Sequence, residues 1–398
     1  MKIKNINDIK NQLAEKKVLV RVDFNVPIIN GQVQDETRIK ETLPTIKLLQ
    51  ELNCKIILLS HLGRPDGKKV DDLSLKIIIP TLEKLIGTQV HFAENCIGQE
   101  AVIGSAALKN GEILLLENCR FHPEEETNNQ EFAEKLATLA DFYINDAFAV
   151  SHRAHASVEA LAKLLPSAAG LLLEKEVNIL SKILEKSEQP LTLVLGGAKI
   201  DTKIGLFKNF IPKANYFLVG GALANTFLLA EGFNIGSSLV EKDKVGTAQE
   251  IALEIESEKK FLRIPEDVVV ADEITENANT ADLPVEDIEG EMKILDIGVK
   301  TAEKFSKYIS ESKTIIWNGP LGLAELKNFQ QGTKTVGEAI AKATKNGVTT
   351  VIGGGDTIDA IKRVGLKPEQ FTHVSTGGGA MLEFLEGKTL PGIAVLEV

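Results

Sequence analysis

Arginine is scarce in this chain, and several of its arginines stand beside predicted strand ends. Only seven of the 45 basic residues are arginine. Arg64 and Arg120 each follow an apolar run that predicts a strand, and Arg153 lies in a loop after a third such run. Arginine carries a planar fork of donors that matches carboxylates and phosphates. Because the carboxyl ends of parallel strands meet at one edge of a sheet, these residues predict a site for a small, highly anionic ligand.

Other polar residues of the first half are expected at the same edge. Arg38 follows Asp35-Glu36-Thr37, a predicted helix start, and two histidines accompany the strand ends. The full set expected at this edge is Asp23, Phe24, Asn25, Arg38, His61, Leu62, Gly63, Arg64, Arg120, His152 and Arg153. A surface salt bridge is the usual role of a single arginine, and that interpretation stays open for each one taken alone.

In the second half of the chain, glycine takes the place of arginine at the strand ends. The glycine-containing turns are Gly196-Gly197-Ala198-Lys199, Gly220-Gly221, Asn318-Gly319-Pro320, Gly353-Gly354-Gly355-Asp356-Thr357 and Thr376-Gly377-Gly378-Gly379. Glycine lets the backbone approach a phosphate closely, and a helix that starts there adds free N–H donors. A tight turn explains any one of these pairs. Five on one edge, with a carboxylate and a hydroxyl attached, predict a nucleotide site with Mg²⁺.

Composition and motif searches exclude several other classes. A formal net charge of −11 argues against a nucleic-acid binder. No run of 18 apolar residues predicts a membrane span, and the amino-terminal residues lack the apolar core of a signal peptide. Cys54, Cys96 and Cys119 fit neither a disulfide framework nor a zinc site. We therefore expect a cytoplasmic protein without nucleic-acid or membrane partners.

The elements that must position these residues alternate along nearly the whole chain. Apolar β-rich runs separated by helical patterns predict parallel sheets covered on both faces. The predicted strands are residues 18–23, 55–60, 90–93, 112–117 and 142–145, then 191–195, 216–219, 268–271, 314–317, 349–352 and 372–375. The expected fold class is α/β, with two doubly wound, mostly parallel-sheet (Rossmann-like) domains joined by a helical hinge.

One segment differs from this alternation. Residues 166–184 begin with proline and small residues and continue as an amphipathic run, with no strand predicted before it. We interpret this run as a helix between two domains. The predicted bounds are 1–168 for the first domain, 169–186 for the interdomain helix, 187–378 for the second domain, and 379–398 for a segment that returns to the first.

The strings at these strand ends, taken together, resemble the phosphoglycerate kinase family from about residue 18 to residue 392. They are Arg21-Val22-Asp23-Phe24-Asn25-Val26-Pro27, Ser60-His61-Leu62-Gly63-Arg64-Pro65, Leu116-Glu117-Asn118-Cys119-Arg120-Phe121, His152-Arg153-Ala154-His155-Ala156-Ser157, Gly196-Gly197-Ala198-Lys199, Trp317-Asn318-Gly319-Pro320, Gly353-Gly354-Gly355-Asp356-Thr357 and Thr376-Gly377-Gly378-Gly379-Ala380. Two strings depart from the family pattern, Ala149-Val150-Ser151 before His152 and Leu323-Ala324 before Glu325.

The resemblance implies reversible transfer of the acyl phosphate of 1,3-bisphosphoglycerate to Mg-ADP, by a monomer. The first-half residues above would bind the triose. The resemblance further implies that Gly197, Ala198 and Pro320 line the adenosine pocket, that Glu325 meets the ribose, that Lys203 and Thr357 meet phosphates beside Gly354 and Gly355, and that Asp356 holds Mg²⁺. It gives Arg38, Lys199, Lys203, Gly377 and Gly378 the role of stabilising the transferring phosphoryl group.

The residues alone point to the same chemistry. An arginine-rich anion site in one domain and a glycine-rich nucleotide site in another indicate a transfer between two phosphorylated ligands. The carboxylate acceptor that the resemblance implies is already ionised near neutral pH, so no general base is needed and none is evident. Exposure to water would waste the phosphoryl group on hydrolysis, so we expect the two sites to meet only when the domains close. Two alternatives remain at this point. A dehydrogenase with tandem Rossmann domains would need the dinucleotide fingerprint, which is missing, and a non-catalytic nucleotide sensor would need the loss of a phosphoryl-stabilising residue.

Overall fold

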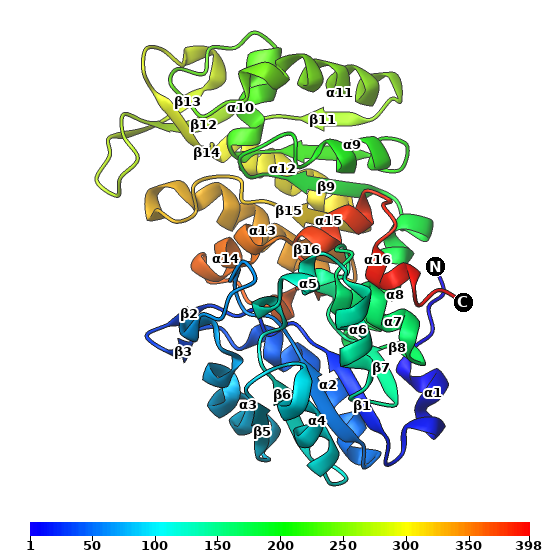
Figure 1. Ribbon diagram of the computed structural model, residues 1–398. Coiled ribbons are helices and arrows are strands. Elements are labelled where there is room, and N and C mark those ends of the chain that lie inside the picture. The colour runs from blue at the N-terminus through cyan, green and yellow to red at the C-terminus, as the bar shows by residue number, and fades with distance from the viewer. The chain divides into compact units, whose positions relative to one another are not determined.

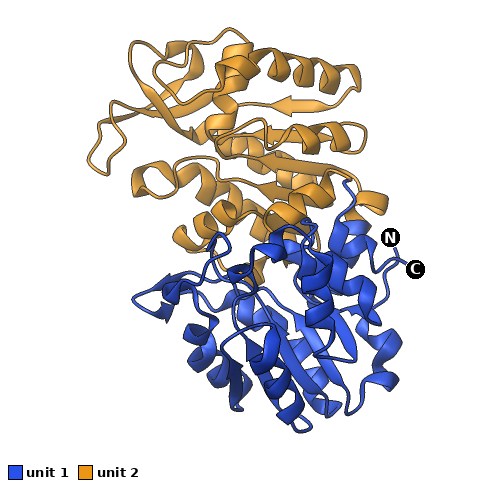
Figure 2. Cartoon of the chain, in the orientation of Figure 1, with its two compact units in different colours: residues 1–181, 388–398 blue, residues 182–387 orange.

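The computed structural model describes all 398 residues and divides them into two compact units, coloured separately in Figure 2. Unit 1 comprises Met1–Ser181 and Lys388–Val398, and unit 2 comprises Lys182–Gly387. These units are defined by packing, and the bounds of the predicted functional domains stay a prediction. None of the helices has the combined length and apolar character needed to cross a membrane.

Unit 1 is built on six parallel strands in the order β5-β6-β4-β1-β7-β8. The strands are β1 Lys17–Arg21, β4 Lys55–Leu59, β5 Val90–Ala93, β6 Ile113–Leu116, β7 Phe142–Asn145 and β8 Ser167–Ala169. A separate two-stranded hairpin consists of β2 Ile28–Ile29 and β3 Gln32–Val33. The order places β1 and β4 at the centre of the sheet, so polar residues that follow these strands are held by the most buried part of unit 1.

Alternate side chains of β1 enter two different cores, which is why the strand reads as a continuous apolar run. Val18 and Val20 pack with Ile46 of α2 in one core. Leu19 packs with Phe132 of α6 in the other. Helices therefore cover both faces of the sheet, as predicted for a parallel sheet. The helices of unit 1 are α1 Ile6–Leu13, α2 Thr37–Glu51, α3 Ile79–Ile86, α4 Gly98–Ala107, α5 Pro123–Glu126, α6 Gln130–Ala137, α7 Leu161–Leu164 and α16 Pro391–Ala394.

Helix α8, Leu171–Lys186, continues from unit 1 into unit 2. It confirms the helix predicted in residues 166–184, but the expectation that no strand precedes it is wrong. Ser167–Ala169 forms β8, which pairs with β7 at the edge of the sheet. A strand of one serine and two alanines lacks the β-branched residues that mark strands in a sequence.

The last residues of the chain pack with unit 1, and both termini lie there (Figure 2). Ile3 pairs with Glu397 in an isolated antiparallel bridge. The side-chain nitrogen of Asn145 donates to the carbonyl of Gly392 at 3.1 Å. The carboxyl-terminal segment is thus tied directly to the end of β7, one of the strands that carries site residues.

Unit 2 contains a second six-stranded parallel sheet, in the order β11-β10-β9-β15-β16-β17. Figure 1 labels four of these strands, β11, β9, β15 and β16, which follow one another in this order. Its strands are β9 Leu191–Leu195, β10 Tyr216–Val219, β11 Phe261–Arg263, β15 Thr314–Asn318, β16 Thr349–Gly353 and β17 His373–Val374. The predicted strand 268–271 exists as β12, Asp267–Ala271, but its place in the parallel series is wrong. It forms an antiparallel sheet with β13 Thr280–Pro284 and β14 Lys293–Ile297.

The two faces of this sheet are also both covered. Leu218 of β10 packs into a core with Phe305 of α12 and Val336 of α13. Its neighbour Phe217 contacts Phe207 of α9, with ring centroids 5.8 Å apart. The helices of unit 2 are α9 Ile204–Phe210, α10 Gly221–Ala230, α11 Val245–Ser257, α12 Val299–Glu311, α13 Gln331–Lys345, α14 Gly355–Arg363 and α15 Gly379–Leu385.

Three buried aspartates hold the amino termini of helices in place. Asp146 accepts hydrogen bonds from the backbone of Leu172 in α8, and Asp296 accepts one from Gly332 in α13. Burial raises the pKa of each of these two carboxyls to about 7. Asp267 accepts from the backbone N–H groups of Lys300 and Thr301 in α12 at 2.9 and 2.7 Å. These carboxylates satisfy N–H groups that the helices cannot satisfy internally.

We predict that Asp267→Ala lowers the free energy of unfolding by about 2–3 kcal/mol, because it leaves the buried N–H of Thr301 and the partly buried N–H of Lys300 without an acceptor. The neighbouring substitution Glu266→Ala is the matched control. Glu266 forms only an exposed ion pair with Lys304, and its loss should cost less than about 0.5 kcal/mol. Urea unfolding followed by circular dichroism compares the two variants, and equal stability losses would contradict the capping role.

Candidate functional site

The polar residues predicted in the first half follow the carboxyl ends of neighbouring strands in unit 1. Asp23 follows β1, His61 follows β4, Arg120 follows β6, and Arg153 lies beyond the end of β7. Asp23, His61 and Arg120 are buried, with 4%, 2% and 4% of their surface exposed. The topology therefore brings residues that are about 130 positions apart in the chain to one edge of one sheet.

Asp23 and Asn25 connect three loops at this edge. The Asp23 Oδ2 atom lies 2.5 Å from Arg38 Nη1, at the start of α2. The Asn25 side-chain oxygen accepts from the backbone N–H of Gly63 at 2.9 Å. Gly63 has a φ of +63°, and a Cβ atom there would lie 2.7 Å from Leu73 Cδ2, so this position strongly favours glycine. These contacts hold the loop after β4 against the loop after β1.

His61 lies among arginines and remains neutral. Burial, reinforced by the charges of Arg21, Arg120, Arg38 and Arg153, holds the pKa of His61 well below its usual value. Its Nδ1 atom lies 3.3 Å from Arg21 Nη2. We call these five residues, Arg21, Arg38, His61, Arg120 and Arg153, the basic cluster.

Arg21 is a member that the sequence prediction missed. It is the last residue of β1 and is fully buried. It stands at the end of the apolar run Val18-Leu19-Val20, so the sequence reads it as part of a strand rather than as a loop residue. The one available signal is its place at the end of the apolar run, two residues before Asp23, because a buried arginine inside an apolar strand must have specific partners.

The other predicted residues differ in how closely the structure joins them to the cluster. Arg120 Nη1 donates to the carbonyl of Gly63 at 2.9 Å, and its Nε lies 3.1 Å from Glu126 Oε1. Arg153 Nε lies 3.3 Å from His152 Nε2. Arg64 is exposed and makes no hydrogen bond or ion pair within the chain, so the structure leaves its guanidinium available to a ligand.

The backbone turns of unit 2 approach one another more closely than side chains would allow. A Cβ atom on Gly196 would lie 2.1 Å from the carbonyl oxygen of Pro320, and one on Gly319 would lie 2.3 Å from the backbone of Gly196. Hydrogen bonds close the contact, since Gly197 N–H donates to the Pro320 carbonyl at 2.9 Å. The ends of β9 and β15 can meet in this way only because both carry glycine.

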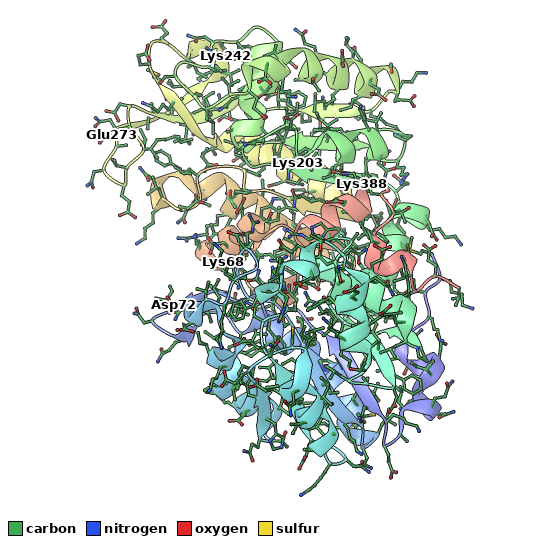
Figure 3. The ribbon with its side chains drawn as sticks, viewed as in Figure 1. Lys68, Asp72, Lys203, Lys242, Glu273 and Lys388 are labelled. Carbon is green, nitrogen blue, oxygen red and sulfur yellow. The ribbon has the colours of Figure 1, made fainter.

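Lys203, labelled in Figure 3, is the buried cation of this edge. It is 8% exposed, and its Nζ donates to the side-chain oxygen of Asn318. Burial lowers the pKa of Lys203 to about 8, although Asp356 and Glu386 act in the opposite direction. Asn318 was not predicted as a side-chain contact. It also donates to the carbonyl of Gly353 at 2.6 Å and so ties Lys203 to the end of β16.

Helices α14 and α15 each begin directly after a glycine with left-handed backbone. Gly354 has a φ of +96° before α14, and Gly378 has a φ of +54° before α15. Asp356, in the first turn of α14, is exposed, whereas Thr357 is buried. The Thr357 hydroxyl accepts from Gly319 N–H at 2.7 Å and donates to the Gly353 carbonyl at 2.8 Å. Its predicted contact with a phosphate stays a prediction.

Two cavities lie along this glycine-rich edge, and they share Gly197, Ala198 and Asp356. The first has a volume of about 430 Å³, is mainly apolar, and includes Pro320, Leu323 and Glu325 in its lining. The second, of about 360 Å³, is lined by the glycine turns together with Lys199 and Lys203. Gly354, Gly355 and Gly378 also line the second cavity, while Gly377 is buried beside it. An apolar cavity joined to a glycine-lined one fits a base with its attached phosphates.

The donor set suits Mg²⁺ held jointly with a ligand. Asp356 lines both cavities with an exposed carboxylate, and the chain has no cluster of three or more side chains able to hold a metal by themselves. Magnesium in phosphate-transfer sites is commonly bound by one or two carboxylates plus substrate phosphates and water. The residues present therefore fit a magnesium ion that arrives with its phosphate ligand.

The chain as a whole is similar to one known family of proteins. The phosphoglycerate kinase family model matches residues 6–388. A phosphoglycerate kinase of Dictyoglomus turgidum is 48% identical over 395 residues, with 99% of each chain covered, and one of Moorella thermoacetica is 47% identical with 97% of each covered. The solved phosphoglycerate kinase of Coxiella burnetii is 38% identical, with a TM-score of 0.90 and 99% of each chain covered. The solved enzyme of Pyrococcus horikoshii is 32% identical, with a TM-score of 0.86 and coverage of 99% of this chain and 98% of the other. The chain belongs to the phosphoglycerate kinase family, the ATP:3-phosphoglycerate 1-phosphotransferases of glycolysis.

Proposed function

We propose that the basic cluster of unit 1 binds 3-phosphoglycerate and 1,3-bisphosphoglycerate. The observation that carries this proposal is the convergence of four guanidinium groups and a neutral histidine at one sheet edge of an acidic protein. Arg64, exposed beside the cluster, adds a fifth guanidinium. Asp23 and Asn25 support the ligand loops, and Phe24, Leu62 and Gly63 shape them. Guanidinium groups match both the phosphate and the carboxylate of such a triose.

The nucleotide, ATP or ADP, is proposed to lie along the glycine-rich edge of unit 2. The apolar cavity beside Gly197, Ala198 and Pro320 suits the adenosine, with Glu325 at its rim near the ribose. The phosphates follow into the second cavity, toward Lys203, Gly354 and Gly355. Magnesium would be held by Asp356 together with the phosphates, and it would neutralise charge on the transferring group.

The transfer step needs charge stabilisation rather than a base. In the ATP-consuming direction the acceptor is the carboxylate of 3-phosphoglycerate, which is already ionised near neutral pH. Arg38, Lys199 and Lys203 supply positive charge, and the start of α15, which follows Gly377 and Gly378, supplies N–H donors. Because the two substrates belong to different units, we include closure of the units about α8 as a step of the cycle. We further propose that the enzyme acts as a monomer in the cytoplasm.

We predict that Arg38→Ala reduces kcat on the order of 10³-fold, because this guanidinium meets the phosphoryl group in transfer. Binding of Mg-ATP, measured by calorimetry, should stay within about twofold of wild type since Arg38 belongs to unit 1. Lys40→Ala, on the same helix, removes an exposed cation paired only with Glu36 and serves as the control. A folded Arg38→Ala enzyme with more than about a tenth of wild-type kcat would exclude this role.

A second prediction concerns the pH dependence of nucleotide use. The side chain of Lys203 is charged below its pKa of about 8. Its attraction for phosphates is therefore present at neutral pH and is lost as the pH rises through about 8. We expect kcat/KM for Mg-ATP to fall in this range, and Lys203→Ala to be less active and to lack this decline. Lys208→Ala, an exposed lysine of α9, is the control. A Lys203→Ala profile parallel to wild type would remove Lys203 from the site.

A third prediction tests the metal carboxylate. We expect Asp356→Ala to raise the Mg²⁺ concentration needed for half-maximal activity by about tenfold or more. Asp359→Ala, one turn along α14, removes a carboxylate that pairs only with Arg363 and should leave the magnesium response unchanged. A coupled assay of 3-phosphoglycerate with ATP, titrated with Mg²⁺ and reversed with chelator, makes the comparison. A normal magnesium response in Asp356→Ala would rule out this assignment.

A further inference from the structure

Beneath the basic cluster lies a buried carboxylate that takes no direct part in the site described above. Glu125 of α5 is fully buried, as is Ser157. The two carboxylate oxygens of Glu125 accept from Ser157, one from its hydroxyl at 2.6 Å and the other from its backbone N–H at 2.8 Å. Ser157 lies in the π-helical turn Ala156–Ala160, directly after the loop that carries His152 and Arg153. π-Helical turns are frequent at functional sites.

The same serine reaches the basic cluster through Arg21. Because its hydroxyl proton is given to Glu125, the Ser157 oxygen is left to accept, and Arg21 Nε donates to it at 2.8 Å. Arg21 Nη1 donates to the carbonyl of Val22 at 2.5 Å. These two bonds fix the plane of the guanidinium, and its remaining nitrogen, Nη2, faces His61.

This orientation decides which nitrogen of His61 carries the proton. Arginine only donates, so the Nδ1 atom that faces Arg21 Nη2 at 3.3 Å must accept. The carboxylate that could instead favour a proton on Nδ1 is Asp23, whose Oδ1 lies 4.0 Å away, too far for a hydrogen bond. A neutral histidine that accepts at Nδ1 carries its proton on Nε2. No hydrogen bond within the chain uses that Nε2–H, which leaves it free to donate to a ligand.

We propose that Glu125 is a positioning residue of the triose site: through Ser157 it orients Arg21, which holds His61 as the Nε2–H tautomer that donates to the substrate. This inference rests on the proposed function of the basic cluster. Glu125 also acts on the loop itself, since its bond to the backbone of Ser157 anchors the turn that follows Arg153.

An ion pair with the neighbouring histidine does not explain Glu125. His155 Nδ1 lies 3.8 Å from Glu125 Oε1 but makes no hydrogen bond. Burial, together with Arg120, Arg21, Arg153 and His152, lowers the pKa of His155 to about 3, so this histidine is uncharged at neutral pH. The positive group that Glu125 serves is therefore the guanidinium of Arg21, to which it is joined by the two hydrogen bonds of the Ser157 hydroxyl.

Steady-state kinetics and histidine NMR of the full-length enzyme test this inference. Glu125→Gln should raise the KM for 3-phosphoglycerate about tenfold or more, as loss of supporting hydrogen bonds commonly does, while the KM for Mg-ATP changes less than about twofold. The ¹⁵N spectrum of the ligand-free enzyme, with His61 assigned through His61→Gln, should show the Nε2–H form in wild type and a tautomer mixture in the variant. Glu124→Gln makes the same charge change at an exposed position of α5 and should match wild type in both readouts.

Ser157→Ala provides the second variant, because it removes the hydroxyl link while Glu125 and the backbone bond remain. It should shift the His61 tautomer and raise the same KM even where Glu125→Gln fails to fold. A folded Ser157→Ala enzyme with wild-type KM, or with His61 still wholly in the Nε2–H form, would overturn the inference. Arg120→Ala in the same assay distinguishes the proposed triose site from the proposed role of Glu125 within it. A raised KM in Arg120→Ala alone would support the triose site and contradict the role of Glu125. Wild-type KM values in Arg120→Ala, Glu125→Gln and Ser157→Ala would overturn the proposed function of the cluster as well.

Discussion

Guanidinium groups that lie close together at one sheet edge repel one another, and the buried contacts around this edge of unit 1 offset that repulsion. Arg21, Arg38, Arg120 and Arg153 all act on His61, so their charges lie near one another in a partly buried region. Three of these arginines have a carboxylate partner. Arg38 pairs with Asp23 and Arg120 with Glu126, whereas Arg21 is joined to Glu125 through the hydroxyl of Ser157. The carboxylates stabilise the empty cluster without cancelling it, which leaves a net attraction for an anionic ligand.

Unit 2 meets a different constraint, the close approach of backbone to ligand. Its strands end in glycines whose missing side chains let neighbouring turns touch, and Lys203 is its one buried cation. Asn318 and Thr357 lock these turns together through hydrogen bonds to Gly353 and Gly319. A nucleotide phosphate would then meet mainly N–H groups that are already held in position, which lowers the cost of ordering the site on binding.

The sequence predicts most of this architecture because long apolar strands and polar strand ends carry strong local signals. Strands such as β5, β9 and β10 have the predicted bounds. Short edge strands such as β8 were missed, since three residues of low β-propensity leave little pattern. Local sequence also cannot tell that β12 leaves the parallel sheet, because pairing partners are set by tertiary contacts. Arg21 and Glu125 were missed for the same reason: the serine that joins them lies 136 residues from the one and 32 from the other.

Burial lowers the pKa of both His61 and Lys203, yet the two groups end with opposite charge states at neutral pH. His61 lies among cations and becomes a neutral donor, whereas the carboxylates Asp356 and Glu386 support the charge of Lys203 near its pKa of about 8. A site that moves a phosphoryl group to a carboxylate needs no proton transfer, so neither group has to act as an acid or a base. In the proposed sites each group would therefore serve ligand binding alone. His61 would add a directed hydrogen bond to a site rich in charge, and Lys203 would add charge to a site made mainly of oriented backbone. The two sheets of this enzyme thus offer an anion different groups, side-chain guanidinium at one edge and backbone N–H at the other, and the difference follows from which residue type, arginine or glycine, occupies the ends of their strands.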